Sequence, residues 1–189
     1  MVRKNLVLTG FMGTGKSAVG RKAARRLRMQ FVDMDDVLEE RAAMSISRSF
    51  AERGEDAFRE MESALAAELG TREGVVIATG GGAMLREENR MALSRNGIMV
   101  CLQCDAETVL RRLGRSDDRP LLVTPPMESE SARRTDRLER IKALLAARRS
   151  VYESLPWQVD TTDLSLEQVV GQVVAIYRAE NKDGNHGND

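Results

Sequence analysis

A glycine-rich run near the start of the chain has the residues and spacing of a phosphate-binding loop. Gly10, Gly15, Lys16 and Ser17 follow the pattern G-x-x-x-x-G-K-S. In such a loop the backbone N–H groups cradle phosphates, the lysine reaches the outer phosphates and the serine hydroxyl binds Mg²⁺. An apolar run before it and a helical pattern after it supply the required context. The run therefore predicts nucleotide binding, with Ser17 as a magnesium ligand.

Two carboxylates follow in the run "FVDMDD", where a second strand is expected to end. Alternation along a strand would place Asp33 and Asp35 on the same side, facing a cleft. One could hold the magnesium shell through water, and the other could accept a hydrogen bond from a substrate hydroxyl. Phosphoryl transfer to an alcohol needs this division of roles. Asp36 is explained well as an acid at a helix start.

Three arginines stay ambiguous when each is taken alone. Arg59 and Glu62 are three residues apart on a predicted helix and could simply pair on a solvated face. Arg119 in "RPLL" and Arg148 in "RRSVY" have no clearer assignment. Arginine prefers planar anions, which it holds with a bidentate fork. The pattern thus leaves open whether these side chains bind carboxylate, phosphate or neighbouring acids.

Alternating strands and helices must position these residues. This alternation predicts an α/β fold with a parallel sheet covered on both faces. Ligands of such sheets bind beyond the carboxyl ends of the strands, so the glycine loop, Asp33–Asp35 and Gly80–Gly82 should converge on one cleft. The expected strands are "NLVLTG", "QFVDMD", "GVVIATGGG", "IMVCLQC" and "WQVD". The expected helices are "KSAVGRKAARRL", Asp36 to Leu69 with breaks near Ala43–Ser45 and at Gly54, "REENRMALSRNG" closed by Gly97, "DAETVLRRL", Arg133 to Tyr152, and Ser165 to about Glu180 with a capping box to Gln168.

The chain is expected to form one domain over residues 1–180. The segment from Gly114 to Ser131 carries three of the four prolines, many charges and little periodicity. Loops of this length are usually functional or disordered. Residues 181–189 form a polar tail that we expect to be disordered.

Composition excludes several classes of function. Basic and acidic residues both number 29, so no basic excess points to nucleic acid. No window approaches the ~20 apolar residues of a membrane span, and the N-terminal apolar run is too short for a secretory signal. Two cysteines and ten methionines suit a reducing compartment. We therefore expect a cytoplasmic protein with small-molecule partners only.

Cysteine and histidine offer little for catalysis. Cys101 and Cys104 form a C-x-x-C that could be a redox motif. The surrounding run "IMVCLQC" instead favours a buried strand, in which cysteine is a common core residue. The single histidine, His186, lies in the polar tail. A histidine-dependent mechanism is therefore disfavoured.

Together the motifs resemble those of the shikimate kinase family. "GFMGTGKSAVG", "FVDMD", "GEDAFREME", "ATGGGA", "RRLGRSDDRPLL" and "AARRSVY" occur in the order and spacing of that family, from about Leu6 to Ala179. The resemblance implies a P-loop kinase fold with three α/β/α layers and a five-stranded parallel sheet. It also implies a substrate-binding helical segment at about 34–62, a lid at about 114–131 and a monomeric enzyme. Its reaction would transfer phosphate from ATP to the 3-hydroxyl of shikimate with Mg²⁺, in chorismate and aromatic amino acid biosynthesis.

The resemblance also implies a role for each matching residue. Asp35 would bind shikimate hydroxyls and serve as base, while Arg112 would pack on adenine and Arg119 would reach the ATP phosphates from the lid. The implied catalytic residues are Asp35, Lys16 and Arg119. The implied ATP-binding residues are Gly13, Thr14, Gly15, Lys16, Ser17, Ala18, Arg112 and Arg119. The implied shikimate-binding residues are Asp35, Arg59, Gly80, Gly81, Gly82 and Arg148, and the implied magnesium ligands are Ser17 and Asp33.

Two departures from the family pattern and two rival functions stay open. Ala18 stands where many members have threonine, and the usual R-x-P-L-Y lacks its proline here. The spacing from Tyr152 favours Arg148 over Arg149 as the carboxylate ligand. A gluconate or nucleoside monophosphate kinase would share the phosphate loop. A guanine-nucleotide switch would carry N-K-x-D after a strand, a pattern that the only "NK", at Asn181, does not fit.

Overall fold

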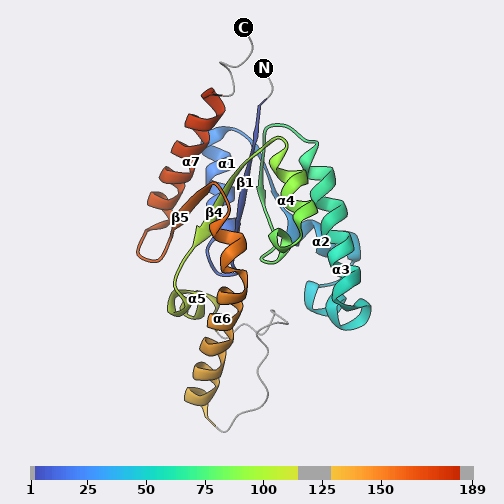
Figure 1. Ribbon diagram of the computed structural model, residues 1–189, viewed down its shortest axis with the longest axis vertical. Helices are drawn as coiled ribbons and strands as arrows, with labels where there is room; N and C mark the ends of the chain where they lie inside the picture. Colours follow the sequence, from blue (N-terminus) through green and yellow to red (C-terminus); the bar gives the residue numbers. More distant parts are fainter. Residues whose placement is uncertain (1–2, 115–128, 184–189) are drawn as a thin grey trace.

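The protein is built around a parallel sheet of five strands (Figure 1). The computed structural model describes residues 3–114 and 129–183. The strands are arranged in the order β2-β3-β1-β4-β5, so the first strand lies at the centre. Leu8 of the central strand pairs with Ala78 on one side and Val100 on the other. The strands are β1 (Asn5–Gly10), β2 (Gln30–Asp33), β3 (Val75–Ala78), β4 (Gly97–Gln103) and β5 (Trp157–Asp160).

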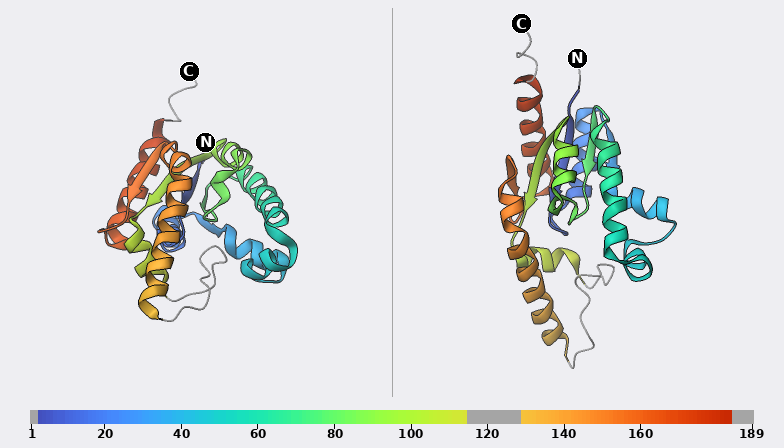
Figure 2. Two further views of the ribbon diagram at one scale, coloured as in Figure 1. Left: turned by 60° about the horizontal axis from the view of Figure 1, so that its bottom comes forward. Right: turned by 45° about the vertical axis from the view of Figure 1, so that its right-hand side comes forward.

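Alternation along the strands divides the core into two layers. Leu6 and Leu8 of β1 pack with α1 (Lys16–Leu27) and α7 (Leu166–Asp183) on one face of the sheet. Val7, between them, joins the core of the other face. Figure 2 shows the helices on opposite sides of the strands. The second face is covered by α2 (Met34–Ala42), α3 (Ile46–Gly70), α4 (Glu87–Ser94), α5 (Ala106–Leu113), α6 (Glu130–Glu153) and the short 3₁₀ helix η1 (Ala83–Leu85).

The predicted break inside the long helical segment is confirmed. Ala43 ends α2 in a left-handed conformation, and Ser45 caps α3 by accepting a hydrogen bond from the backbone N–H of Arg48. Gly54 interrupts α3 with φ of 84° and ψ of 165°. A positive φ is easy for glycine and strained for other residues. The kink separates the first two turns of α3 from the rest of the helix.

Three predicted boundaries are wrong. Gly97 does not close the fourth helix but begins β4, because it pairs in register with Asn5 and its missing Cβ leaves room for the Leu93 carbonyl. The helix predicted from Arg133 begins earlier, where Ser129 caps α6. The last helix continues to Asp183, so residues 181–183 are not part of a disordered tail.

Contacts with the start of the chain account for the extension of the last helix. Tyr177 of α7 donates its hydroxyl to the Lys4 carbonyl at 2.8 Å, and the Lys4 N–H donates to the Asn181 side chain at 3.2 Å. These contacts tie the end of the helix to the start of β1. No helix among residues 3–114 and 129–183 is long and apolar enough to cross a membrane.

The capping box predicted at Ser165 is present and gives a stability prediction. The Ser165 N–H donates to the Gln168 side chain at 2.9 Å, and the Gln168 N–H donates to the Ser165 hydroxyl at 3.3 Å. Because Ser165→Ala removes an N-cap, we expect the free energy of unfolding to fall by about 1 kcal/mol in urea denaturation. Ser94→Ala is the control, since that exposed hydroxyl bonds within its own helix. An equal loss in both variants would contradict a specific capping role.

Candidate active site

The glycine-rich run forms the loop between β1 and α1 at the carboxyl edge of the sheet. Gly10, Gly13 and Gly15 have φ values of 126°, 78° and 98°, and a Cβ on Gly10 would overlap the Leu102 carbonyl. Gly15 stands at the N-cap of α1, where no side chain of the described residues caps the helix and no acid lies in its first turn. The helix N-terminus therefore presents N–H groups and a positive dipole end, which suit an anion.

Lys16 lies across this loop. Its ammonium group donates to the carbonyls of Gly10 at 2.9 Å and Phe11 at 3.0 Å, while the Thr14 hydroxyl donates to the same Phe11 carbonyl at 2.8 Å. These bonds hold the loop in shape and keep the lysine charge beside the helix N-terminus. The arrangement concentrates positive potential where a polyphosphate would bind.

Asp33 and Asp35 occupy different structural positions, which corrects the expectation that they alternate along one strand. β2 ends at Asp33, whose carboxylate caps α2 by accepting a hydrogen bond from the Asp35 N–H at 3.1 Å. Capping starts the helix early, so Asp35 lies in its first turn. Asp33 is 7% exposed. Burial raises the pKa of its carboxyl, and a hydrogen bond from Ser17 offsets only part of this rise.

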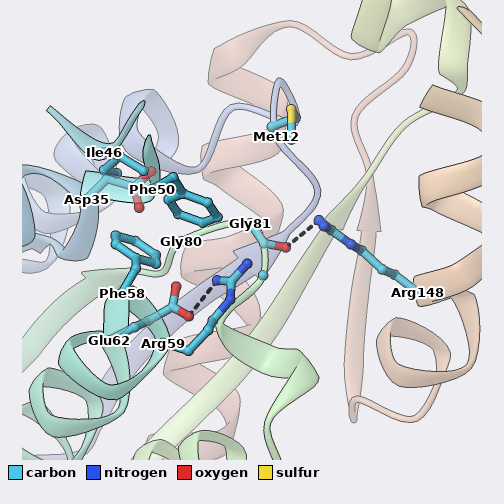
Figure 3. Close-up of a pocket in the computed structure, with 11 residues that line it drawn as sticks. Met12, Asp35, Ile46, Phe50, Phe58, Arg59, Glu62, Gly80, Gly81 and Arg148 are labelled. Carbon is cyan, nitrogen blue, oxygen red and sulfur yellow. Dashed lines mark hydrogen bonds and ion pairs between the residues drawn. The ribbon is translucent and has the colours of Figure 1, made fainter. Parts of the chain in front are cut away.

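A pocket next to the phosphate loop gathers residues from five separate parts of the chain (Figure 3). Asp35 of α2, Arg59 of α3 and Arg148 of α6 reach it from three helices. The backbone of the triple glycine that follows β3 forms one wall. The complete lining is Met12, Asp35, Ile46, Phe50, Phe58, Arg59, Glu62, Gly80, Gly81, Gly82 and Arg148.

Arg59 both pairs with acids and lines the pocket. Its guanidinium lies 2.8 Å from Glu62 and 3.0 Å from Glu55, so the ion pair expected from the sequence is present. The guanidinium carbon also lies 5.6 Å from the ring centre of Phe50 and 5.5 Å from that of Phe58. Glu62 is 1% exposed. Burial raises the pKa of its carboxyl, and the neighbouring Arg59 offsets only part of this rise. The acids and rings fix the orientation of the guanidinium.

Arg148 enters the same pocket from the opposite side. It donates to the Gly81 carbonyl at 3.1 Å (Figure 3). Its guanidinium carbon also lies 5.4 Å from the centre of the Phe11 ring. Arg149 points elsewhere, since it pairs with Glu153 at 2.7 Å and its side chain is 75% exposed. Of the two arginines weighed from the sequence, Arg148 therefore lines this pocket and Arg149 does not.

The triple glycine approaches the charged side chains too closely for a larger residue. A Cβ on Gly80 would lie 2.6 Å from a carboxylate oxygen of Glu62 and 2.9 Å from one of Asp35. A Cβ on Gly82 would lie 2.8 Å from the guanidinium of Arg59. A side chain at Gly80 or Gly82 would therefore push these charged groups aside, whereas a Cβ on Gly81 would lie at an ordinary contact distance of 3.4 Å from the Met12 backbone.

Of the two predicted ATP-binding arginines outside the loop, the structure describes only Arg112. Arg112 of α5 donates to the Gly13 carbonyl at 3.5 Å and to the Thr161 hydroxyl at 2.8 Å, so it lies beside the phosphate loop. Arg119 and most of the predicted lid fall outside the described residues.

The sequence interpretation missed the aromatic part of the site. Three of the four phenylalanines surround the two pocket arginines: Phe11 lies against Arg148, while Phe50 and Phe58 lie against Arg59. A ring beside a guanidinium favours the cation by its quadrupole and excludes water from it. Phe11 and Phe58 lie within the motifs "GFMGTGKSAVG" and "GEDAFREME", but the sequence interpretation gave them no role in the site.

Neither cysteine takes part in this site. Cys101 and Cys104 are free thiols, and Cys101 is buried in β4 as the strand interpretation predicted. Burial raises the pKa of Cys101 to about 11, so its thiol is protonated at neutral pH. A redox motif needs an accessible thiolate, which this environment disfavours.

A phosphate loop between a central parallel strand and a helix, with a small-molecule pocket beside it, places the protein among the P-loop kinases. The family model for shikimate kinase matches residues 12–178. The chain is 40% identical to shikimate kinase from Pelotomaculum thermopropionicum, over 94% of this chain and 98% of that one. The chain therefore belongs to the shikimate kinase family.

Solved structures agree with the family assignment. The structure of shikimate kinase from Acinetobacter baumannii in complex with shikimate superposes with a TM-score of 0.83, at 31% identity and over 94% of each chain. The structure from Aquifex aeolicus gives 0.76 at 32% identity, over 93% of this chain and 97% of that one. A gluconokinase from Sinorhizobium meliloti gives 0.60 at 17% identity, covering all of this chain and 99% of that one, which shows a shared fold alone.

Proposed function

We propose that the protein transfers the γ-phosphate of ATP to the 3-hydroxyl of shikimate. One observation carries the choice of acceptor: two arginines from distant helices line one pocket beside the phosphate loop, with Asp35 in the same pocket. Arginine holds carboxylates with a planar fork, and an aspartate accepts hydrogen bonds from hydroxyls. A small acid that carries both a carboxylate and hydroxyls matches this set of groups.

In this proposal ATP binds at the glycine-rich loop between β1 and α1. The proposed phosphate contacts are the N–H groups at the start of α1 and the ammonium of Lys16, with Gly13, Thr14, Gly15 and Ala18 forming the rest of the cradle. Arg112 packs on the adenine in this proposal, and its hydrogen bonds to Thr161 hold it beside the loop. Arg119 keeps its proposed role at the phosphates.

Ser17 and Asp33 would hold Mg²⁺. The serine hydroxyl contacts the buried carboxylate, so two oxygen ligands already lie together. Within the described residues no group of three or more metal-binding side chains occurs. Mg²⁺ fits such a sparse site, because it is usually held by one or two protein groups together with waters and substrate phosphates. When bound, it supplies charge neutralisation at the phosphates.

The proposed reaction uses groups that the pocket and the loop bring together. The 3-hydroxyl oxygen of shikimate forms a bond to the γ-phosphorus as the bond from that phosphorus to the β–γ bridging oxygen breaks. Asp35 accepts the hydroxyl proton, and ADP leaves. Lys16 stabilises the charge on the phosphoryl oxygens during transfer. Arg59 and Arg148 hold the carboxylate and thereby fix which hydroxyl faces the nucleotide.

ADP release with a panel of acceptors tests the proposal. We expect turnover with shikimate, and only background release with gluconate, with nucleoside monophosphates or with no acceptor. All mixtures contain ATP and Mg²⁺, and mass spectrometry of the product locates the phosphate. Faster turnover with gluconate or a nucleoside monophosphate would replace the proposal with the corresponding kinase. Nucleotide hydrolysis that requires a protein partner and does not respond to any small acceptor would indicate a nucleotide switch.

A further inference from the structure

The Gly81 carbonyl receives two hydrogen bonds from one helix. The Tyr152 hydroxyl donates to it at 2.7 Å, and Arg148 donates to it at 3.1 Å. Both donors belong to α6 and lie four residues apart, so they project from the same face of the helix. A carbonyl oxygen has two lone pairs, and these two donors use both of them.

Tyr152 and Arg148 meet at this carbonyl. The guanidinium and the phenol hydroxyl both donate to the Gly81 oxygen, so the two side chains lie side by side on the triple-glycine wall. Tyr152 is 5% exposed, and burial raises the pKa of its phenol. The hydroxyl therefore stays protonated and keeps its donor proton for the carbonyl. The residue lies outside the pocket lining, so it acts through Arg148 and Gly81.

We infer that Tyr152 is a positioning residue that sets Arg148 and the triple-glycine wall for the carboxylate of the acceptor. The shorter tyrosine bond satisfies the Gly81 carbonyl, and the arginine is left with further N–H groups for the substrate. Without the hydroxyl, the carbonyl would be satisfied by the guanidinium alone. A charge-assisted bond of this kind is strong, and it would draw the arginine toward the wall and away from its ligand. This inference rests on the proposed function and deepens it.

Tyr152→Phe tests the inference because it removes only the hydroxyl. We expect KM for shikimate to rise about threefold to tenfold, the scale of one neutral hydrogen bond. We expect kcat and KM for ATP to change less than twofold, because the phenol hydroxyl bonds to the Gly81 carbonyl and not to the phosphate loop.

The chain offers a matched control in its only other tyrosine. Tyr177 is 3% exposed and also donates its hydroxyl to a backbone carbonyl, that of Lys4, at 2.8 Å. It packs on the opposite face of the sheet. Tyr177→Phe should lose a similar amount of stability in urea denaturation and leave KM for shikimate unchanged. A rise in KM in both variants would mean a general structural effect and would overturn the inference.

The methyl ester of shikimate, used as a second substrate, tests the role of Tyr152 separately from the proposed function of the enzyme. The methyl ester of shikimate lacks the anion, so Tyr152→Phe should change its kcat/KM by less than twofold if the tyrosine acts through the carboxylate site. An equal loss with acid and ester would overturn the inference. The inference would also be overturned if Tyr152→Phe kept its fold and its KM for shikimate were unchanged. Absence of shikimate turnover in the unaltered enzyme would instead refute the proposed function.

Discussion

Asp35→Asn is expected to lower kcat for shikimate by about 100-fold or more, the scale of losing a general base. The substitution keeps the shape of the side chain but replaces a proton acceptor with an amide. ATP affinity should barely change, because Asp35 lines the acceptor pocket and not the phosphate loop. Steady-state kinetics with shikimate, together with ATP titration of the variant, measure the two effects separately.

Asp36→Asn provides the control for this prediction. Asp36 is the next acid of the same helix, but it is exposed and pairs with Arg21 at 3.0 Å. Its replacement should leave kcat within about twofold, as is usual for surface substitutions. If Asp35→Asn weakened ATP binding as much as turnover, Asp35 would belong to the nucleotide site and another group would accept the proton.

Arg59→Lys is expected to lower kcat/KM for shikimate by roughly 10- to 150-fold. Lysine keeps the charge but lacks the planar fork, and hydrogen bonds to charged groups are worth about 1.5–3 kcal/mol each. Arg59 also binds Glu62 and Glu55 while lining the pocket, and a single ammonium would not reproduce that geometry. Arg149→Lys, at an exposed arginine outside the pocket, is the control and should have little effect.

The methyl ester of shikimate shows whether the Arg59 loss comes from the carboxylate. The ester should be a poorer substrate of the unaltered enzyme by a similar factor. The two losses should not add, because both disrupt the same contact. If they multiplied, Arg59 would be a helix arginine that serves only its ion pairs, and the carboxylate site would lie elsewhere.

The sequence was sufficient for the sheet and for the charged part of the site. Short apolar runs predicted every strand, because the inner strands of a parallel sheet are buried on both faces and are mostly apolar. The glycine loop predicted phosphate binding from its residue types and spacing alone. Its helix, from Lys16 to Leu27, has the predicted bounds.

Helix capping within a few residues and packing between distant parts of the chain account for what the sequence did not predict. Asp35 was interpreted as a strand residue, but the Asp33 carboxylate caps a helix, so Asp35 reaches the pocket from a helical turn. The last helix runs past Glu180 because Lys4, far away in sequence, binds its final turns. The phenylalanines around the arginines gave no periodic signal, since they come from a loop and from both sides of the Gly54 kink.

The central place of β1 has a consequence for synthesis of the chain. Its partner β3 begins about 65 residues after β1 ends, and β4 completes the other side only at Gln103. At 5–20 residues per second, the first strand leaves the ribosome roughly 3 to 15 seconds before either neighbour exists. During that interval an apolar segment with two unpaired edges must avoid other chains. The strand that carries the phosphate loop is therefore made first, yet it can be ordered only after more than half of the protein has been translated.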